Sequence, residues 1–278
     1  MRRPVVTQPV RVARFVVARP LRVAFLIVAV LASGRYLAAQ AVPAEAQRVT
    51  NARGIAPADL TGYWVSVVTE DWKFRMVTPN AGELGALPLN PEGQRVAKTW
   101  DAAKDEAAGE QCKAYGAGNI MRLPVRLHVT WENDTTLKID IDTGTQTRLL
   151  HFGAPAPANT QPSWQGYSVA EWEMAPAARG GGGGGARGGA AAPRGGNLKV
   201  VTTQLRPGYV RKNGAPYSDR TTVTEFFDLN TLPNGDQWIS LTTKIDDPVY
   251  FTRPLVMTTD FKKLPDAAGW NPTPCSVK

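Results

Sequence analysis

A period-two alternation of apolar and polar residues is the feature that most constrains how this chain can fold. Leu127 and Val129 alternate with Arg126 and His128, and the pattern recurs in short runs separated by turn-forming residues. Successive side chains of a strand point to opposite faces, so each run predicts a half-buried strand. We expect strands over residues 59–68, 126–131, 137–142, 145–152, 166–174, 198–205, 221–229 and 237–245. Many short strands joined by turns predict a mainly β fold, either an antiparallel barrel or a sandwich.

One segment departs from this pattern and predicts a short helix after the first strand. Asn90 is a favourable N-cap, and Pro91 suits the first position of a helix. Val96 and Trp100 then follow at helical spacing, and Gly109 ends the segment. We therefore expect a single helix over residues 90–109.

The N-terminal segment predicts export. Residues 23–33 form an apolar run that seven arginines surround, and residues 1–41 contain no acid. Ala39-Gln40-Ala41 follows as a small-x-small cleavage pattern, so residues 1–41 resemble a signal peptide in all three of its parts. We expect a periplasmic or secreted protein that meets the membrane only through this signal. The basic part before the apolar run is long, which leaves an uncleaved N-terminal anchor as the alternative.

Removing the signal changes the charge argument. The full chain carries a formal net charge of +8, but residues 42–278 hold 25 basic and 24 acidic residues. The basic pI therefore reports mainly the signal, and we expect no nucleic-acid partner. We expect the exported chain to be a monomer.

The sequence after the signal predicts a single domain with two atypical segments. Residues 42–58 predict a flexible lead, and residues 59–278 predict one β-rich domain. Residues 179–196 are rich in Gly and Arg and predict a disordered loop between two strands. Cys112 and Cys275 are the only cysteines, and an oxidising compartment predicts a structural disulfide between them.

Candidate catalytic residues are few. The chain has two histidines, His128 and His151, and two carboxylates of interest, Glu225 in the middle of a strand and Asp247 at a strand end. A histidine with a carboxylate would suit an envelope hydrolase. The alternative is structural: either Glu225 pairs with an arginine such as Arg148 across the sheet, or its face of the strand is solvated, and an Asp before Pro248 caps backbone N–H groups in a turn. We expect no cofactor and no metal site, and we lean against an enzyme.

Aromatic residues favour ligand binding. Eight tryptophans follow the signal, and a barrel lined partly by aromatic rings would suit a flat apolar ligand. The candidate ligand contacts are Arg126, Arg148, Trp131 and Trp172.

The first strand resembles the opening of a lipocalin. Gly62-Tyr63-Trp64 matches the G-x-W signature of that family. The resemblance implies a calycin-like barrel in which Gly62 opens the strand and Trp64 closes one end of the barrel. It also implies a basic partner for the tryptophan, for which Arg253 is the candidate.

Longer stretches resemble a group of exported bacterial proteins that have no assigned function. The matching stretches are residues 162–169, 214–218, 224–227, 246–254 and 269–275. This resemblance implies export and a β-rich structure. We therefore expect an exported β-barrel that binds a small apolar or amphipathic ligand. The alternatives are the envelope hydrolase and an envelope partner-binding module, for which an exposed Trp72 or Trp270 would be the sign.

Overall fold

The computed structural model describes residues 50–174 and 196–277. The predicted signal peptide (1–41) and nearly all of the predicted loop insert (179–196) lie outside these residues. The strands are β1 (Gly62–Val67), β2 (Arg126–Asn133), β3 (Thr136–Ile141), β4 (Gln146–Phe152), β5 (Tyr167–Met174), β6 (Gly196–Thr203), β7 (Gly208–Arg211), β8 (Ala215–Tyr217), β9 (Thr222–Thr231), β10 (Gln237–Asp246) and β11 (Leu255–Leu264). The helices are α1 (Trp72–Met76), α2 (Pro91–Lys98) and α3 (Ala102–Ala107), with 3₁₀ turns η1 (Gln111–Tyr115) and η2 (Ile120–Arg122). Within the described ranges, no helix is both long and apolar enough to cross a membrane.

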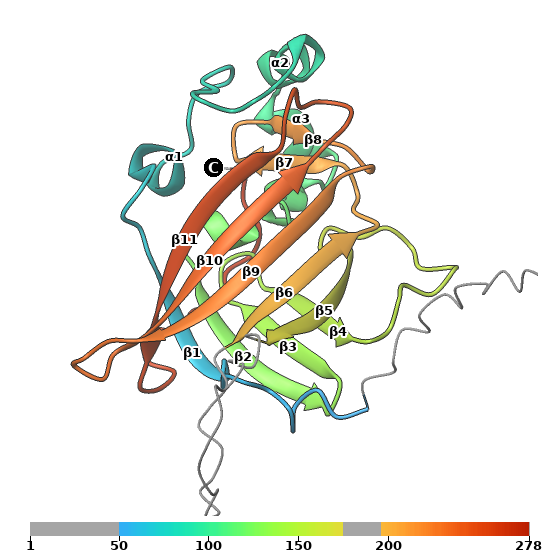
Figure 1. Ribbon diagram of the computed structural model, residues 1–278. Helices are drawn as coiled ribbons and strands as arrows, with labels where there is room; N and C mark the ends of the chain where they lie inside the picture. The colour runs from blue at the N-terminus through green and yellow to red at the C-terminus, as the bar shows by residue number, and fades with distance from the viewer. Residues whose placement is uncertain (1–49, 175–195, 278) are drawn as a thin grey trace, which may run out of the picture. The chain divides into compact units, whose positions relative to one another are not determined.

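Nine strands form a closed barrel in the order β1-β11-β10-β9-β6-β5-β4-β3-β2 (Figure 1). β1 pairs with both β11 and β2, which closes the sheet. All neighbouring pairs are antiparallel except β4 and β5, which run parallel. The predicted mainly β barrel is confirmed, and the sandwich alternative is wrong. The short strands β7 and β8 form a separate hairpin.

The sequence pattern predicts no strand over residues 255–264, yet β11 supplies the pair that closes the barrel. Thr258, Thr259 and Asp260 interrupt its apolar run, so the alternation is hard to recognise. The backbone pairing with β1 and β10 is nevertheless continuous. Tertiary pairing therefore outweighs a weak local signal here.

Apolar side chains fill much of the barrel interior. Leu127, Leu150, Val200 and Leu241 come from four different strands and are 0–1 % exposed. They belong to one buried cluster that also includes Phe227 and the neighbouring inward-facing residues. Residues this inaccessible leave no room for water beside them, so this part of the barrel is a packed core.

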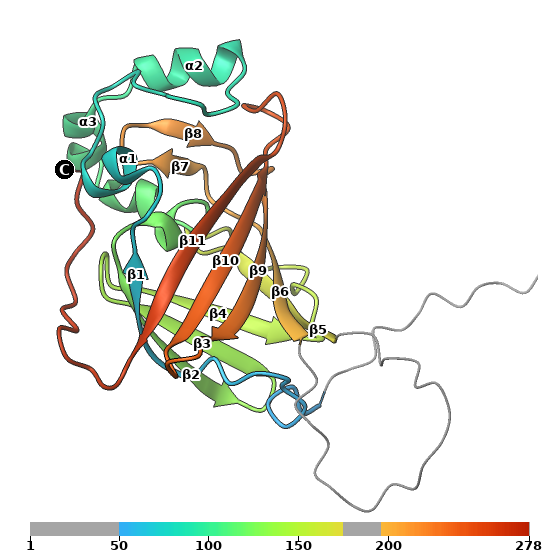
Figure 2. The same ribbon diagram turned by 60° about the vertical axis from the view of Figure 1, so that its left-hand side comes forward.

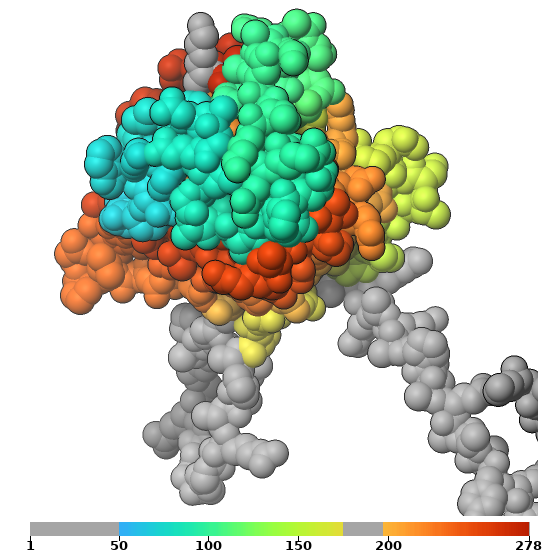
Figure 3. All heavy atoms as spheres, turned by 90° about the horizontal axis from the view of Figure 1, so that it is seen from above, coloured from blue at the N-terminus to red at the C-terminus, as the bar shows by residue number. Residues whose placement is uncertain are grey.

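The helices gather with β7 and β8 at one end of the barrel (Figures 1 and 2). Seen from above, the segment from α1 to α3 lies across this end (Figure 3). The single helix predicted over residues 90–109 is wrong in detail, because α2 and α3 are separate helices, each with its own cap. Asn90 and Asp101 accept hydrogen bonds from the N–H groups of Gly93 and Ala103, so a second N-cap divides the segment.

Aromatic rings and Ala52 of the predicted lead pack together at the opposite end of the barrel. Trp131 and Trp172 both contact Phe152, with ring centroids 5.6 Å and 5.3 Å apart. Ala52 is fully buried in the same cluster, and its carbonyl accepts a hydrogen bond from the Trp172 indole at 3.0 Å. Within the predicted lead, Ala52 therefore packs against the aromatic rings at this end of the barrel, while its neighbours Asn51 and Arg53 are exposed.

Candidate functional site

The two histidines lie on the outer face of the barrel and in separate aromatic stacks. His128 on β2 stacks on Tyr63, with ring centroids 4.1 Å apart, and Trp270 meets both rings edge-on. His151 on β4 stacks on Tyr167 at 4.6 Å. Burial lowers the pKa of His151, which keeps that ring neutral at pH 7.

Glu225 pairs with Arg148 inside the barrel, as the structural alternative predicts. The Arg148 guanidinium donates to both carboxylate oxygens, at 2.9 Å and 2.5 Å, and both side chains are fully buried. Thr202 accepts a further bond from Arg148 at 3.3 Å and lies 2.8 Å from the Ser168 hydroxyl. The two charges of this pair neutralise each other, and neither side chain is accessible to solvent.

The polar side chains around Arg148 and Glu225 form a layer between two apolar clusters. Along β9, Glu225 lies between Val223 of one cluster and Phe227 of the other. Along β10, the buried Thr243 occupies the same place between Leu241 and Ile245. Arg148 is therefore part of the barrel core, and its side chain is inaccessible to solvent.

Asp247 has the predicted turn role. Its carboxylate accepts hydrogen bonds from the backbone N–H groups of Ser218, Val249 and Tyr250 and from the Thr221 hydroxyl. Burial alone would raise the pKa of Asp247, but these four donors outweigh it and lower the pKa below the usual value. An acceptor with four donors is already satisfied and is poorly placed to take a proton from a substrate.

The four catalytic candidates therefore lie in four separate places. The histidines are on the outer face, Glu225 is inside the barrel, and Asp247 is in a turn. Within residues 50–174 and 196–277, no three His, Cys, Asp or Glu side chains are grouped so that they could hold a metal ion. The geometry brings together none of the pairs that the hydrolase alternative needs.

The other residues that the sequence predicts for the site contribute to the packing of the barrel or lie on its outer face. Trp131 and Trp172 close the end of the barrel, and Arg126 lies beside Gly269 on the outer face. Trp64 is fully buried, and its indole donates to the Leu60 carbonyl at 2.9 Å.

The basic partner of Trp64 in β1 differs from the one that the lipocalin resemblance implies. Gly62 has a φ of 112°, which favours glycine, and Trp64 follows in the strand. Lys263 on β11 lies over the Trp64 ring, with its Nζ 5.3 Å from the ring centroid. Arg253 is exposed ahead of β11. The prediction of Arg253 as the partner is wrong, because the continuous pairing of β1 with β11 brings the later lysine over the ring.

A cleft of about 690 Å³ opens at the helical end of the barrel. We call it the end cleft. Its walls come from α1 and the following loop, from the α2–α3 junction, from η1 and η2, from the β3–β4 turn, from β7 and from the C-terminal tail. The lining residues are Phe74, Arg75, Met76, Val77, Thr78, Pro79, Asn80, Ala81, Trp100, Ala102, Tyr115, Asn119, Arg122, Leu123, Pro124, Thr143, Arg211, Lys212 and Val277. Its size falls within the range of about 300–1,000 Å³ that is usual for small-molecule sites.

The lining of the end cleft is apolar and basic. Four cations line it, namely Arg75, Arg122, Arg211 and Lys212, and its lining contains no Asp or Glu. Burial lowers the pKa of each of the three arginines. The charge of Arg122 also lowers the pKa of Arg75 and of Arg211, although all three remain protonated at neutral pH. Arg122 therefore repels Arg75 and Arg211, whereas Glu70 raises the pKa of Arg75, and Asp71 and Glu83 raise the pKa of Arg211.

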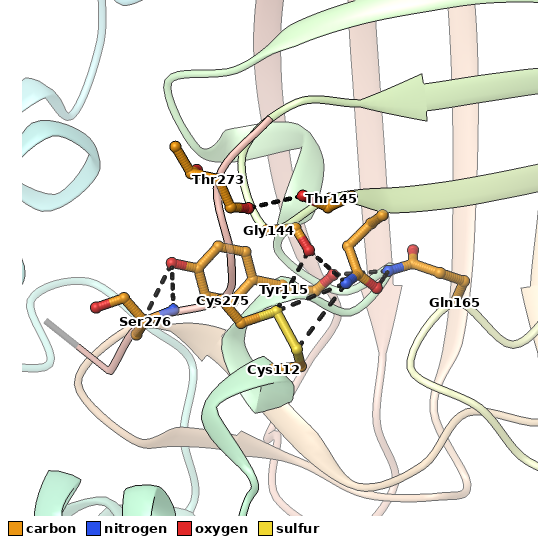
Figure 4. Close-up of a disulfide and its surroundings, with 9 residues drawn as sticks. Cys112, Tyr115, Gly144, Thr145, Gln165, Thr273, Cys275 and Ser276 are labelled. Atoms are coloured by element: carbon orange, nitrogen blue, oxygen red, sulfur yellow. Dashed lines mark hydrogen bonds between the residues drawn. A yellow bond between two sulfur atoms is a disulfide. The ribbon is translucent and has the colours of Figure 1, made fainter. Parts of the chain in front are cut away.

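The predicted disulfide is confirmed, and it holds one wall of the end cleft. Cys112 in η1 is bonded to Cys275 in the C-terminal tail (Figure 4). The Tyr115 hydroxyl bonds with both the N–H and the carbonyl of Ser276, each at 3.1 Å. Val277, the next residue, lines the cleft. The bond thus links two segments 163 residues apart at the edge of the cleft.

Sequence reasoning missed the arginines of the end cleft. Arg75, Arg122 and Arg211 stand in unrelated segments, and each alone resembles an ordinary surface charge. Only the fold brings them together. No protein-family model, curated protein or solved structure matches this chain, so its function has to be inferred from the site itself.

Proposed function

We propose that this protein is an exported, monomeric β-barrel that binds a small amphipathic molecule, and that the ligand occupies the end cleft. The observation that carries the proposal is the contrast between a packed barrel core and a cleft of about 690 Å³ at its end. Aromatic and apolar side chains, among them Phe74, Trp100 and Tyr115, form part of its lining beside the cations. Concave sites with this mixture are typical of small-molecule binding.

Export belongs to the same proposal. The leader of residues 1–41 supports it, and so does the disulfide, which persists best in an oxidising compartment. Membership of the exported bacterial group that the stretches 162–169 and 246–254 resemble is also proposed. N-terminal sequencing of the protein from its native envelope should begin at residue 42. A mature chain that still begins at Met1 in the cytosol would contradict export.

The ligand site can be tested with a neutral fluorescent probe, N-phenyl-1-naphthylamine. Ala81 lines the end cleft and Ala86 does not, although both are exposed and lie in the same connection. Ala81→Trp should fill the cleft and weaken probe binding by about tenfold, because a bulky ring replaces the space for the ligand. Ala86→Trp is the matched control and should bind as the wild type does. Equal affinity in both variants would place the probe elsewhere and would contradict the proposal.

Partner binding is a second candidate function, because an apolar surface lies at the rim of the cleft. Trp72, Met76 and Val77 are 67 %, 54 % and 59 % exposed. Trp72 and Met76 are four residues apart on α1, so they share one face of the helix. Met76 and Val77 also line the cleft. Crosslinking in the native envelope through a photoreactive residue at position 72 tests this candidate, and a discrete adduct would support it.

A further inference from the structure

We propose that the end cleft recognises its ligand by an anionic group, a carboxylate, phosphate or sulfate, held among Arg75, Arg122 and Arg211, while the apolar body of the ligand lies along Phe74, Trp100 and Tyr115. This inference rests on the proposed function and names the chemical class of its ligand. Its first support is the location of the charge. Residues 42–278 are nearly neutral as a whole, yet Arg75, Arg122 and Arg211 line one cleft whose lining contains no Asp or Glu.

The second support is that carboxylates outside the cleft compensate these cations only in part. Arg75 pairs with Glu70 at 2.5 Å, and Arg122 pairs with Asp71 at 3.0 Å. The side chains of Glu70 and Asp71 are 33 % and 51 % exposed, so water weakens both pairs. Among the described residues, no ion pair joins Arg211 directly to a carboxylate, and Asp71 and Glu83 act on it only from a longer distance.

The third support is an unsatisfied donor. The side chain of Arg75 is 1 % exposed, and its Nε donates to the Arg122 carbonyl at 2.8 Å. Its Nη2 is buried and has no hydrogen-bond partner in the structure. A buried charged donor without a partner is costly, and an anion in the cleft would reduce that cost by its field. Arg75 thus strengthens the positive potential at the wall of the cleft.

The fourth support is that the cations are held in place. The Arg211 guanidinium lies over the Phe74 ring at 4.1 Å from its centroid and donates to the Leu84 carbonyl at 2.5 Å. Arg122 is 5 % exposed and is fixed through its pair with Asp71. Guanidinium groups ordered in advance bind anions with less loss of side-chain entropy. An apolar ring stacked beside a guanidinium also suits a ligand that is apolar next to its charge.

The test compares two probes that differ only in an anionic group. 8-Anilinonaphthalene-1-sulfonate has the same ring system as N-phenyl-1-naphthylamine and adds one sulfonate. The disulfide-bonded mature protein should bind the sulfonated probe at least about tenfold more tightly, because charged hydrogen bonds to arginine are strong. Octanoate, octyl phosphate and octyl sulfate, each set against neutral octanol as a competitor, then distinguish carboxylate, phosphate and sulfate as the preferred group.

Two arginines in equivalent ring contacts provide the variant and its control. Arg211 lies over Phe74 and Arg206 lies over Trp164, each at 4.1 Å, but only Arg211 lines the cleft. Arg211→Gln should reduce the preference for the sulfonated probe by about tenfold, whereas Arg206→Gln should leave it unchanged. The comparison of the two probes on the wild-type protein requires no variant, so poor folding of Arg211→Gln does not remove the test.

The outcomes separate this inference from the function on which it rests. Equal affinity for both probes, with both weakened by Ala81→Trp, would overturn the anionic ligand and leave the end cleft as the binding site. Binding of both probes that is insensitive to Ala81→Trp would overturn the site and the inference together. A preference for the sulfonated probe that Arg211→Gln abolishes and Arg206→Gln keeps would support both.

Discussion

Buried arginines occur in two regions of this molecule, and their acidic partners differ between the two regions. In the barrel core, Arg148 meets Glu225 through two hydrogen bonds, and both side chains are closed to solvent. At the end cleft, Arg75 and Arg122 have half-exposed or partly exposed acidic partners, and a third arginine, Arg211, stands beside them. The first region is neutral and packed, whereas the second is positive and open.

The difference separates a structural role from a binding role. A buried ion pair whose two charges neutralise each other holds strands in one arrangement, and although Arg148 Nε has no hydrogen-bond partner, the fully buried pair leaves no net charge and no accessible group for a ligand to bind. An excess of ordered positive charge beside apolar rings has a cost that a ligand can reduce. On the proposed function, the polar layer inside the barrel serves the fold and the excess charge at the end cleft serves ligand recognition.

The largest expected effect breaks the matched pair. Glu225→Gln leaves Arg148 buried without a counter-charge and should lower the free energy of unfolding by about 3–5 kcal/mol. Urea denaturation measures the change. Glu171→Gln is the control, because Glu171 pairs with Lys199 at the surface, where the effect should stay within about 0.5 kcal/mol. A loss of less than about 1 kcal/mol in Glu225→Gln would contradict the structural role of the pair.

The next effect concerns the wall of the end cleft. Replacing both cysteines, Cys112→Ser with Cys275→Ser, should lower the free energy of unfolding by about 2–4 kcal/mol, because the disulfide closes a long loop. It should also weaken binding of the anionic probe, since Val277 lines the cleft next to the tethered tail. The far-UV circular dichroism of the barrel should be retained. Unchanged probe affinity in the double variant would show that the tail does not shape the site.

Lowering the pH should reduce the stability of the fold through Asp247, and it should leave the charge of the arginines in the end cleft unchanged. The lowered pKa of Asp247 means that its stabilising effect is present above the unfolded-state value near 3.8 and is lost as pH falls through the lower folded-state value. Asp247→Asn should cost about 1–3 kcal/mol at neutral pH, because it weakens four hydrogen bonds. The difference from wild type should shrink below pH 4 in urea titrations. A difference that is independent of pH would mean that the charge of Asp247 has no such role.

The smallest effect separates the rim from the lining of the cleft. Trp72→Ser should change the free energy of unfolding by no more than about 0.5 kcal/mol, because the side chain is 67 % exposed. It should leave probe affinity unchanged, since Trp72 does not line the cleft. Val77→Ser is similarly exposed but removes a lining residue, so affinity should fall roughly threefold. Fluorescence titration measures both variants, and a larger effect from Trp72→Ser would favour the partner-binding function.

The sequence predicts the local features of the fold well. The alternation of Leu127 and Val129 with polar neighbours gives the correct inward face, and a carboxylate in the middle of an apolar strand predicts a partner for Glu225. Asp247 before a proline predicts a capped turn. These features depend on neighbouring residues, which a single sequence displays directly.

The candidate site could not be predicted in the same way. The end cleft depends on which strands become neighbours and on where the C-terminal tail returns, and no local pattern encodes either. Arg75, Arg122 and Arg211 belong to α1, η2 and β7, so their proximity is a property of the tertiary structure. The same reason explains the wrong partner for Trp64, because the pairing of β11 decides that Lys263 and not Arg253 lies over the ring.

The most direct test of this account is a crystal structure of the protein with 8-anilinonaphthalene-1-sulfonate bound. We predict the dye in the end cleft, with its sulfonate toward Arg122 and Arg211 and with the Arg148–Glu225 pair undisturbed. Dye inside the barrel core, or a cleft that stays empty while the dye occupies another surface, would contradict the account.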